Sequence, residues 1–481
     1  MNKEKTIGWN FDNSYSNLPK SFIYEISPVP VKRPELVIFN HDLADQMGLN
    51  FSNVDNEQLA KMFSGNLLPK GSKSLAQAYA GHQFGHFTML GDGRAVLLGE
   101  HISKSNQRLD VQFKGSGQTP FSRNGDGRAA LGPMLREYLI SEAMYSLNIP
   151  TTRSLAVVKT GENVIREKPL QGAILTRVAS SHIRVGTFQF IRTRENLDEL
   201  NTLVNYTIKR HYPEISKSKN NAYDLLSKLI DKQIELVVNW MRVGFIHGVM
   251  NTDNMAISGE TIDYGPCAFM DSYNLGTCFS SIDHMGRYAY GNQPAITKWN
   301  LARFAECLLT LINPNKDDAL KMATELIDKF DKIYEEKWFN MMKSKLGLIG
   351  DDKEDNLIIF ELLEIMKKQE LDYTNTFLFL MDHEIDDKKS FQNEEFDNWK
   401  IIWQKRLTKD SKNLMELNNP VIIPRNHNVE NVLKSAENND LTPFNDLLQA
   451  LKNPYTNQKV LTKYQSPPPK SDEKYQTFCG T

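Results

Sequence analysis

One segment of the chain holds the side-chain oxygens that a divalent cation prefers. Residues 247–265 contain Asp253, Asn254 and Asp263. Short apolar pieces flank the turn-like residues 258–260, a pattern typical of a β-hairpin. A hairpin would bring Asn254 and Asp263 together as oxygen ligands of one Mg²⁺ shared with phosphate groups. The alternative is structural, with a buried Asn and a buried Asp that only cap the hairpin.

The order of these residues is similar to that in protein kinases, where a loop Asn and the Asp of a D-F-G motif hold the metal. Here the second motif is Asp-Tyr-Gly and begins at Asp263. Kinases place their catalytic Asp two residues after a His. Counted from His247, that position holds Val249, and the nearest acid is Asp253, directly before Asn254. The segment predicts a kinase-like nucleotide site without the usual proton acceptor.

A kinase-like site also needs a strand lysine on the phosphates and a helix glutamate that holds the lysine. Lys114 ends an apolar run, and Glu137 lies in the first turns of a helix that Pro133 opens. This spacing predicts a Lys114–Glu137 ion pair in a strand-rich lobe. Glu142 on the same helix is a less suitable partner because it lies farther along the helix.

Two glycine-rich turns flank the lysine, and their backbone N–H groups are suited to phosphate binding. One turn contains Gly91, Gly93 and Arg94, and the other contains Asp126 and Gly127. Neither matches the G-x-G-x-x-G or Walker A pattern, and each alone is also compatible with a plain turn.

Two arginines, Arg177 and Arg184, follow the next strand-like run. Arginine binds phosphate oxygens in a bidentate manner better than lysine does. Surface arginines are common, so the pair is informative mainly in combination with Lys114.

The elements that must position these residues change character along the chain. Strand-like runs are concentrated in the first half, and helical periodicity dominates beyond about residue 195. We therefore expect an α+β protein with a kinase-like bilobal core and elaborations at both ends. The expected parts are an N-terminal extension (1–75), an N-lobe (76–190), a C-lobe (191–430) and a C-terminal helical segment with a tail (431–481). The expected strands are 36–39, 95–99, 109–114, 154–158 and 172–177, and one expected helix spans 226–241 and stops at Gly244.

Composition narrows the functional class. The 481 residues carry 57 Lys and Arg against 59 Asp and Glu, a net charge of −2, so no general attraction to nucleic acid or membranes is expected. No apolar run approaches the roughly 18–20 residues of a membrane span. Four scattered cysteines form no zinc-binding spacing, and we expect a cytoplasmic protein.

Long motifs identify the chain as similar to the selenoprotein O family. The resemblance covers nearly the whole sequence. Its carriers are YAGHQFG (79–85), GDGRAVLLGE (91–100), QFKGSGQTPFSRNGDGRAALGPMLREYLISEAM (112–144), IPTTRSLAVV (149–158), HGVMNTDNM (247–255), IDYGPCAFMD (262–271) and NPVIIPRNH (419–427).

This resemblance implies a pseudokinase-like fold that binds ATP in an inverted orientation, with the α-phosphate facing the acceptor. The implied reaction transfers AMP, and possibly UMP, to Ser, Thr or Tyr hydroxyls of proteins, with Mg²⁺ or Mn²⁺ as cofactor. By motif, Asp253 resembles the proton acceptor of the family, and Asn254 and Asp263 resemble its metal ligands. The positions that resemble its nucleotide and phosphate contacts are Gly91, Gly93, Arg94, Lys114, Asp126, Gly127, Arg177, Arg184 and Asp263.

Two alternatives remain open at this point. The chain is also compatible with a conventional γ-phosphotransferase in which Asp253 replaces the missing base, and with a non-catalytic ATP-binding scaffold. Some eukaryotic members of the family carry selenocysteine near the C-terminus, where this chain has Cys479. A disulfide between Cys278 and Cys479 that tethers the tail is a further hypothesis, and two free thiols are its alternative.

Overall fold

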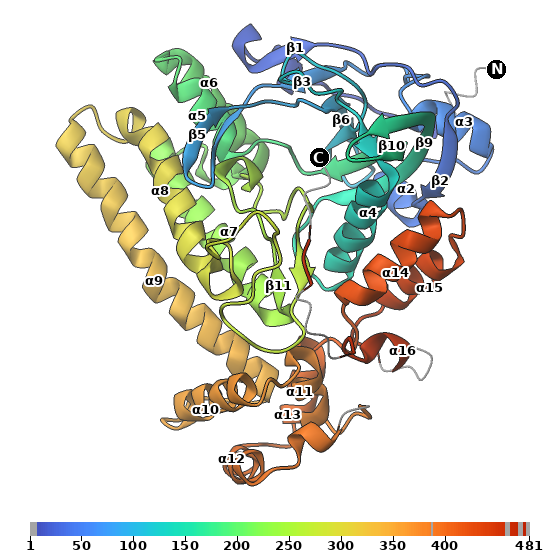
Figure 1. The fold of residues 1–481 in the computed structure, drawn as a ribbon. Helices are drawn as coiled ribbons and strands as arrows, with labels where there is room; N and C mark the ends of the chain where they lie inside the picture. Colours follow the sequence, from blue (N-terminus) through green and yellow to red (C-terminus); the bar gives the residue numbers. More distant parts are fainter. Residues whose placement is uncertain (1–6, 386–387, 457–461, 470–474, 478–481) are drawn as a thin grey trace.

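A strand-rich part and a helical part make up the molecule (Figure 1). The computed structural model describes residues 7–385, 388–456, 462–469 and 475–477. The predicted α+β class is confirmed. Within these described ranges, no helix is both long enough and apolar enough to cross a membrane.

The strand-rich part is one eight-stranded sheet. Its order is β1-β3-β6-β7-β10-β9-β2, with β8 paired to β10, and neighbouring strands are antiparallel. All five expected strands are present in it, and residues 1–75 supply two of its strands and the start of a third. The strands are β1 (Ile23–Glu25), β2 (Glu35–Phe39), β3 (Leu75–Gln77), β6 (Ala95–Ile102), β7 (Arg108–Lys114), β8 (Ala129–Ala130), β9 (Arg153–Ile165) and β10 (Pro169–Ala179).

Two smaller sheets lie outside this order. The hairpin β4 (Ala80–Gln83) and β5 (His86–Met89) packs through β4 against α5 (Val185–Arg192). A second pair, β11 (Phe245–Ile246) and β12 (Ala268–Phe269), lies in the helical part.

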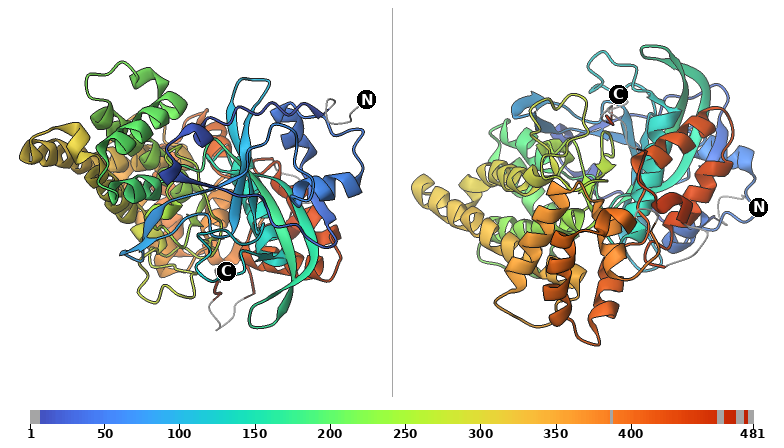
Figure 2. Two further views of the ribbon diagram at one scale, coloured as in Figure 1. Left: turned by 90° about the horizontal axis from the view of Figure 1, so that it is seen from above. Right: turned by 60° about the horizontal axis from the view of Figure 1, so that its bottom comes forward.

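The helix α4 (Leu131–Ser146) packs on β9 and β10 with most of its side chains buried. Its other side is covered by α14 (Asn426–Glu437) and α15 (Thr442–Leu451), the red helices beside it in Figure 2. The remaining α-helices are α2 (His41–Met47), α3 (Asn56–Phe63), α6 (Leu197–His211), α7 (Asn221–Val243), α8 (Gln293–Ile312), α9 (Lys316–Leu346), α10 (Asp355–Lys368), α11 (Tyr373–Leu380), α12 (Glu394–Lys405), α13 (Ser411–Asn418) and α16 (Thr462–Gln465).

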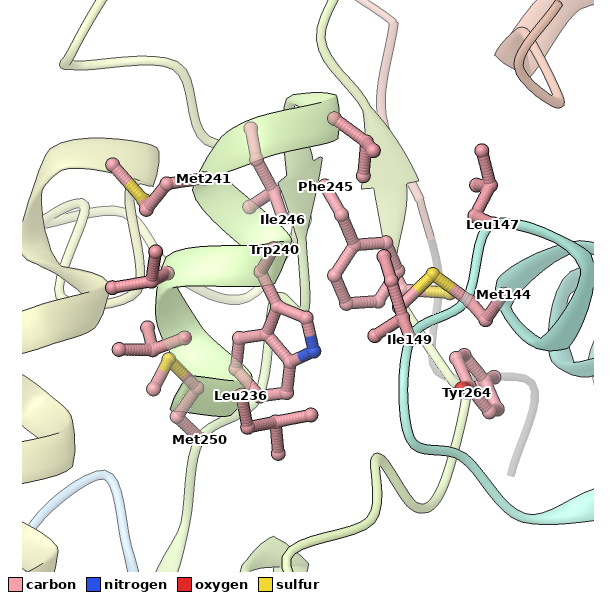
Figure 3. Packing of buried hydrophobic residues seen from close by; sticks show 14 of the residues in the cluster. Met144, Leu147, Ile149, Leu236, Trp240, Met241, Phe245, Ile246, Met250 and Tyr264 are labelled. Atoms are coloured by element: carbon pink, nitrogen blue, oxygen red, sulfur yellow. The ribbon is translucent and has the colours of Figure 1, made fainter. Parts of the chain in front are cut away.

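The helix α7 is central to the helical part and packs on α8 and α9. It ends at Gly244, as predicted, and the φ of 73° at this residue is the left-handed conformation that glycine adopts at helix ends. Figure 3 shows side chains from α4, α7 and β11 meeting in one core, among them Met144, Trp240 and Phe245, with Tyr264 at its edge. The Tyr of the Asp-Tyr-Gly motif therefore ties the two parts of the molecule together.

The hairpin predicted around Gly259 does not form. The N–H of Ile257 donates to the carbonyl of Ile183 (2.9 Å), whereas the N–H of Thr261 donates to the carbonyl of Pro150 (2.9 Å). A turn is present, with a φ of 80° at Gly259, but its two arms pair with different neighbours. The candidate metal ligands are therefore brought together by the tertiary fold and not by a local hairpin.

A buried arginine offers a test of how the C-terminal helices are anchored. Arg425 is 1% exposed, and its guanidinium lies 2.5 Å from Asp271 and 2.8 Å from Asp372. We predict that Arg425→Met lowers the free energy of unfolding by about 3–5 kcal/mol, because two carboxylates lose their buried partner. Lys452→Met removes an exposed pair with Asp42 and should cost less than about 1 kcal/mol. Urea unfolding of both variants checks this, and equal losses would contradict the anchoring role.

Candidate active site

A pocket of about 490 Å³ lies between the sheet and the helical part. Eleven residues assigned from the sequence to nucleotide binding, metal binding or proton transfer all line it. They are Gly91, Gly93, Arg94, Lys114, Asp126, Gly127, Arg177, Arg184, Asp253, Asn254 and Asp263. Residues between 79 and 184 and residues of the 249–266 segment thus line one cavity.

The strand lysine and helix glutamate form the predicted ion pair. Lys114 Nζ, at the end of β7, lies 2.5 Å from Glu137 Oε2 on α4. Both side chains are buried, so the pair is protected from water. Glu142 does not compete for the lysine, because it is bonded to Arg153 (2.7 Å).

Three cationic side chains converge on Asp263. Lys114 Nζ lies 3.2 Å from its Oδ1, Arg184 Nη1 lies 2.9 Å from its Oδ2, and Arg177 Nη1 also donates to Oδ1. Burial alone would raise the pKa of Asp263, but the charges of Arg177, Lys114 and Arg184 outweigh it and hold this pKa well below its usual range. The Asp263 carboxylate is therefore ionised across the neutral range. Its φ of 62° is left-handed, an uncommon backbone state for a non-glycine residue.

The two arginines differ in which guanidinium nitrogen stays free. Arg177 uses Nη1 for Glu137 and Asp263 and Nη2 for Gln112, and only its buried Nε has no partner among the described residues. Arg184 uses Nη1 for the carboxylate of Asp263 and the backbone oxygen of Asp253 and Nε for the carbonyl of His182, which leaves Nη2. Arg177 therefore serves mainly to fix its protein partners, whereas Arg184 keeps donor capacity at the pocket.

Asp253 is buried beside Arg184, whose Nη1 donates to its backbone oxygen (2.6 Å). Its Oδ1 has no hydrogen-bond partner in the described part of the chain, an arrangement that in native structures often marks a chemical role. Burial raises the pKa of Asp253 to about 6, although the charge of Arg184 opposes this. The oxygen lies directly against Gly81 of β4, where a Cβ atom would be only 2.0 Å away. A carboxyl with this pKa is matched to accepting a proton near neutral pH.

The hairpin β4–β5 is fastened to the same segment. The N–H of His82 donates to Thr252 Oγ1 (2.7 Å), and the N–H of Phe84 donates to Asn251 Oδ1 (3.1 Å). Because these acceptors directly precede Asp253, the hairpin and the candidate base form one unit.

The donors available for a cation are few but of a suitable type. Asn254 donates its amide N–H to the carbonyl of Val249 (2.9 Å), which leaves the amide oxygen for a cation. Asp263 adds ionised carboxylate oxygens. In the described residues no three His, Cys, Asp or Glu side chains form a preformed metal cluster. This donor set fits Mg²⁺ or Mn²⁺ bound jointly by protein and phosphate oxygens, rather than in an all-protein cage.

The two predicted glycine turns form one wall of the pocket. A Cβ on Gly91 would lie 2.4 Å from the Phe121 side chain, and one on Gly93 would lie 2.7 Å from the Phe121 carbonyl oxygen. Gly127 has a φ of 65° and lies against the backbone of Gly117. A side chain at Gly91 or Gly93 would push the first turn away from Phe121, and one at Gly127 would clash with the backbone of Gly117.

Several pocket residues were not singled out from the sequence. Arg123 and Arg128 lie in the second glycine turn, whose basic composition was the available indication. Arg166 lies in the β9–β10 connection and holds Asp126 at 2.9 Å. Only the fold of the β9–β10 hairpin brings Arg166 to the pocket, so no local pattern could have identified it.

The predicted disulfide cannot be placed, because Cys479 lies outside the described residues. Cys278 is half-buried with its Sγ 3.4 Å from Asp283, and burial raises the pKa of its thiol to about 11. The tail does return to this neighbourhood, since the N–H of Thr477 donates to the carbonyl of Phe279 (2.7 Å). The Cys278–Cys479 pairing stays a prediction.

Comparisons with known proteins identify the family of the chain. The family model described as protein adenylyltransferase SelO matches residues 5–452. A protein nucleotidyltransferase YdiU of Pelagibacter ubique is 64% identical over 482 residues, covering 99% of this chain and 100% of the relative. Proteins of the same name from Nitrosococcus oceani and Bacillus thuringiensis are each 55% identical, covering 100% of this chain and 99% and 100% of their own lengths. With the whole chain matched at this level, the protein belongs to the protein adenylyltransferase SelO family.

Proposed function

We propose that this protein transfers AMP from ATP to Ser, Thr or Tyr hydroxyls of other proteins and releases pyrophosphate. The observation that carries the proposal is a buried Asp253, whose Oδ1 has no hydrogen-bond partner in the described residues, in the same pocket as a cationic cluster. Val249 stands where a kinase has its catalytic Asp and cannot accept a proton. We therefore assign acceptance of the hydroxyl proton to Asp253.

We also propose that the two parts of the molecule are kinase-like lobes, with residues 76–190 and 191–430 as their cores. The Lys114–Glu137 pair between a strand and the following helix supports this, as does the pocket between sheet and helices. Asn254 and Asp263 take the places of the kinase metal ligands. In this arrangement they would hold Mg²⁺ or Mn²⁺, which neutralises phosphate charge when bound.

The proposed reaction assigns one task to each group. The hydroxyl oxygen of the substrate bonds to the α-phosphorus while the bond from that phosphorus to the bridging oxygen of the β-phosphate breaks. Asp253 takes the hydroxyl proton. Lys114 and Arg184 bind the departing pyrophosphate, and their fixed charge stabilises it without reorganisation. Arg177 keeps Asp263 oriented. This assignment requires ATP with its β- and γ-phosphates against the cations and its α-phosphorus toward Asp253.

Conventional γ-transfer and a non-catalytic scaffold are the competing functions. A γ-phosphotransferase would place the γ-phosphorus at Asp253 and release ADP. A scaffold gains nothing from the Asp253 carboxyl, which has a buried oxygen unpartnered in the described residues and lies beside Arg184.

The position of a radioactive label in ATP distinguishes AMP transfer, γ-phosphate transfer and a non-catalytic scaffold. We predict that ATP labelled at the α-phosphate marks a protein acceptor in the presence of Mg²⁺ or Mn²⁺, and that ATP labelled at the γ-phosphate does not. Asp253→Asn should lower the rate of α-label transfer by about 10²–10⁴-fold with little change in ATP affinity, because only proton acceptance is lost. Scintillation counting of the precipitated protein measures both. Asp253-dependent incorporation of the γ-label would show that the protein is a kinase.

The contact between Gly81 and Asp253 gives a second prediction. Gly81→Ala should place a methyl group within 2.0 Å of Asp253 Oδ1 and displace that carboxyl. A displacement of about 1 Å can cost about 10²-fold in rate, so we expect turnover to fall on that scale while ATP still binds. The matched control is Gly276→Ala, where the nearest atom is 3.3 Å away. Wild-type turnover in correctly folded Gly81→Ala protein, judged by circular dichroism, would contradict the role of Asp253.

A further inference from the structure

The outer edge of β5 presents unpaired backbone groups. The two-residue turn Phe84-Gly85 has positive φ at both residues (50° and 89°), the geometry of a tight hairpin. The bond from the Leu90 N–H to the Tyr79 carbonyl fixes which residues pair across the hairpin. It follows that Phe87 and the alternate residue Met89 direct their N–H and C=O groups outward. No backbone partner for them is found in the part of the chain that the structure describes.

The side chains at these two positions form an exposed apolar pair. Phe87 is 44% exposed and Met89 is 48% exposed, and as alternate residues of one strand they lie on the same face. Met285, three residues before Tyr288 in a loop, is 92% exposed. The hairpin turn contacts that loop, because the Phe84 ring lies 5.1 Å from the Tyr288 ring.

A positive charge without a carboxylate partner lies at the same turn. The Arg287 guanidinium stacks over Trp299 at 5.0 Å and over Tyr288 at 5.7 Å. Its Nη2 lies 3.9 Å from where a Cβ on Gly85 would be. Within the described ranges Arg287 forms no ion pair, and its Nε is buried without a hydrogen-bond partner. A guanidinium that is held by aromatic rings and has no ion-pair partner is suited to bind an acidic side chain of a partner protein.

The surface formed by Phe87, Met89 and Arg287 belongs to a hairpin that contacts the active site. The first strand of the hairpin contacts Asp253 through Gly81 and is bonded by Thr252. A strand added beside β5 would lie two strand spacings, about 10 Å, from β4. An extended chain covers that distance in about three residues.

We propose that the edge of β5 and Arg287 dock an extended segment of the protein substrate by β-strand addition. The backbone of the segment pairs with Phe87 and Met89, an apolar side chain packs on the same two residues, and an acidic side chain reaches Arg287. A hydroxyl-bearing residue a few positions along the segment then arrives at Asp253. The proposal rests on the proposed function, because it identifies how the acceptor protein is held.

A peptide library tests this docking. The probe is a pool of unstructured peptides, each with one Ser, Thr or Tyr among randomised positions, incubated with α-labelled ATP and Mg²⁺. We expect labelled peptides to be enriched in apolar and acidic residues near the hydroxyl. The double variant Phe87→Ser/Met89→Ser should raise the KM for the best peptide at least about tenfold and leave the KM for ATP unchanged. The control Leu417→Ser alters an equally apolar residue, 75% exposed on α13, and should change neither.

Two further measurements separate the parts of the proposal. Arg287→Gln should remove the enrichment of acidic residues without changing that of apolar ones. Backbone N-methylation along the best peptide should block labelling at every second position, as strand pairing requires.

Several outcomes would overturn the docking site. An unchanged peptide KM in the double variant would leave the transfer activity standing and refute the surface. A wild-type dimer that the double variant separates, measured by light scattering, would show that the surface binds a second copy instead. If wild-type protein labels a protein acceptor from α-labelled ATP but no peptide, docking of an extended segment is refuted and the proposed function stands; if it labels neither, the proposed function fails as well.

Discussion

The carboxylate of Asp263, held by three buried cations, is the interaction on which the rest of the site depends. Its partners come from β7, from β10 and from the residue before α5, and Lys114 is in turn held by α4. The strands β7 and β10 and the start of α5 are therefore all positioned against the carboxylate oxygens of Asp263. Removal of any member would leave a buried charge without compensation, which typically costs several kcal/mol. The sheet and the helical part are joined by charge as well as by the apolar core around Tyr264.

The same cluster sets the electrostatics of the pocket. The cationic groups of Lys114, Arg177 and Arg184 outnumber the two carboxylates of Glu137 and Asp263 that bond them. Burial raises the pKa of the neighbouring Asp92 to about 6, so its carboxyl is still largely ionised at pH 7 and offsets one of these positive charges. The wall formed by the glycine turns adds further arginines. An excess of fixed positive charge in a cleft attracts a polyphosphate and holds it without reorganisation. In the proposed reaction, the site would differ from a kinase site in the position of its proton acceptor.

Patterns that are local in the sequence predicted the structure well. The sheet strands and the end of α7 followed from short-range signals, and the Lys114–Glu137 pair followed from the spacing of a strand and the next helix. The hairpin at Gly259 failed because a turn signal does not specify which partner each arm will find, and Ile183 and Pro150 are distant in sequence. Arg166 and the contact between Gly81 and Asp253 likewise depend on tertiary packing alone. Residue types and spacing suggested the proposed metal and phosphate contacts, whereas the proposed role of Asp253 as the proton acceptor in AMP transfer came from motif resemblance.

The central claim is that bound ATP turns its α-phosphorus, not its γ-phosphorus, toward the proton acceptor. A crystal structure with a non-hydrolysable ATP analogue and Mn²⁺, whose anomalous scattering locates the metal, tests this most directly. The account predicts the α-phosphorus nearest Asp253, the β- and γ-phosphates against Lys114 and Arg184, and Mn²⁺ between Asn254 and Asp263. A γ-phosphorus beside Asp253, with the α-phosphate among the cations, would contradict it.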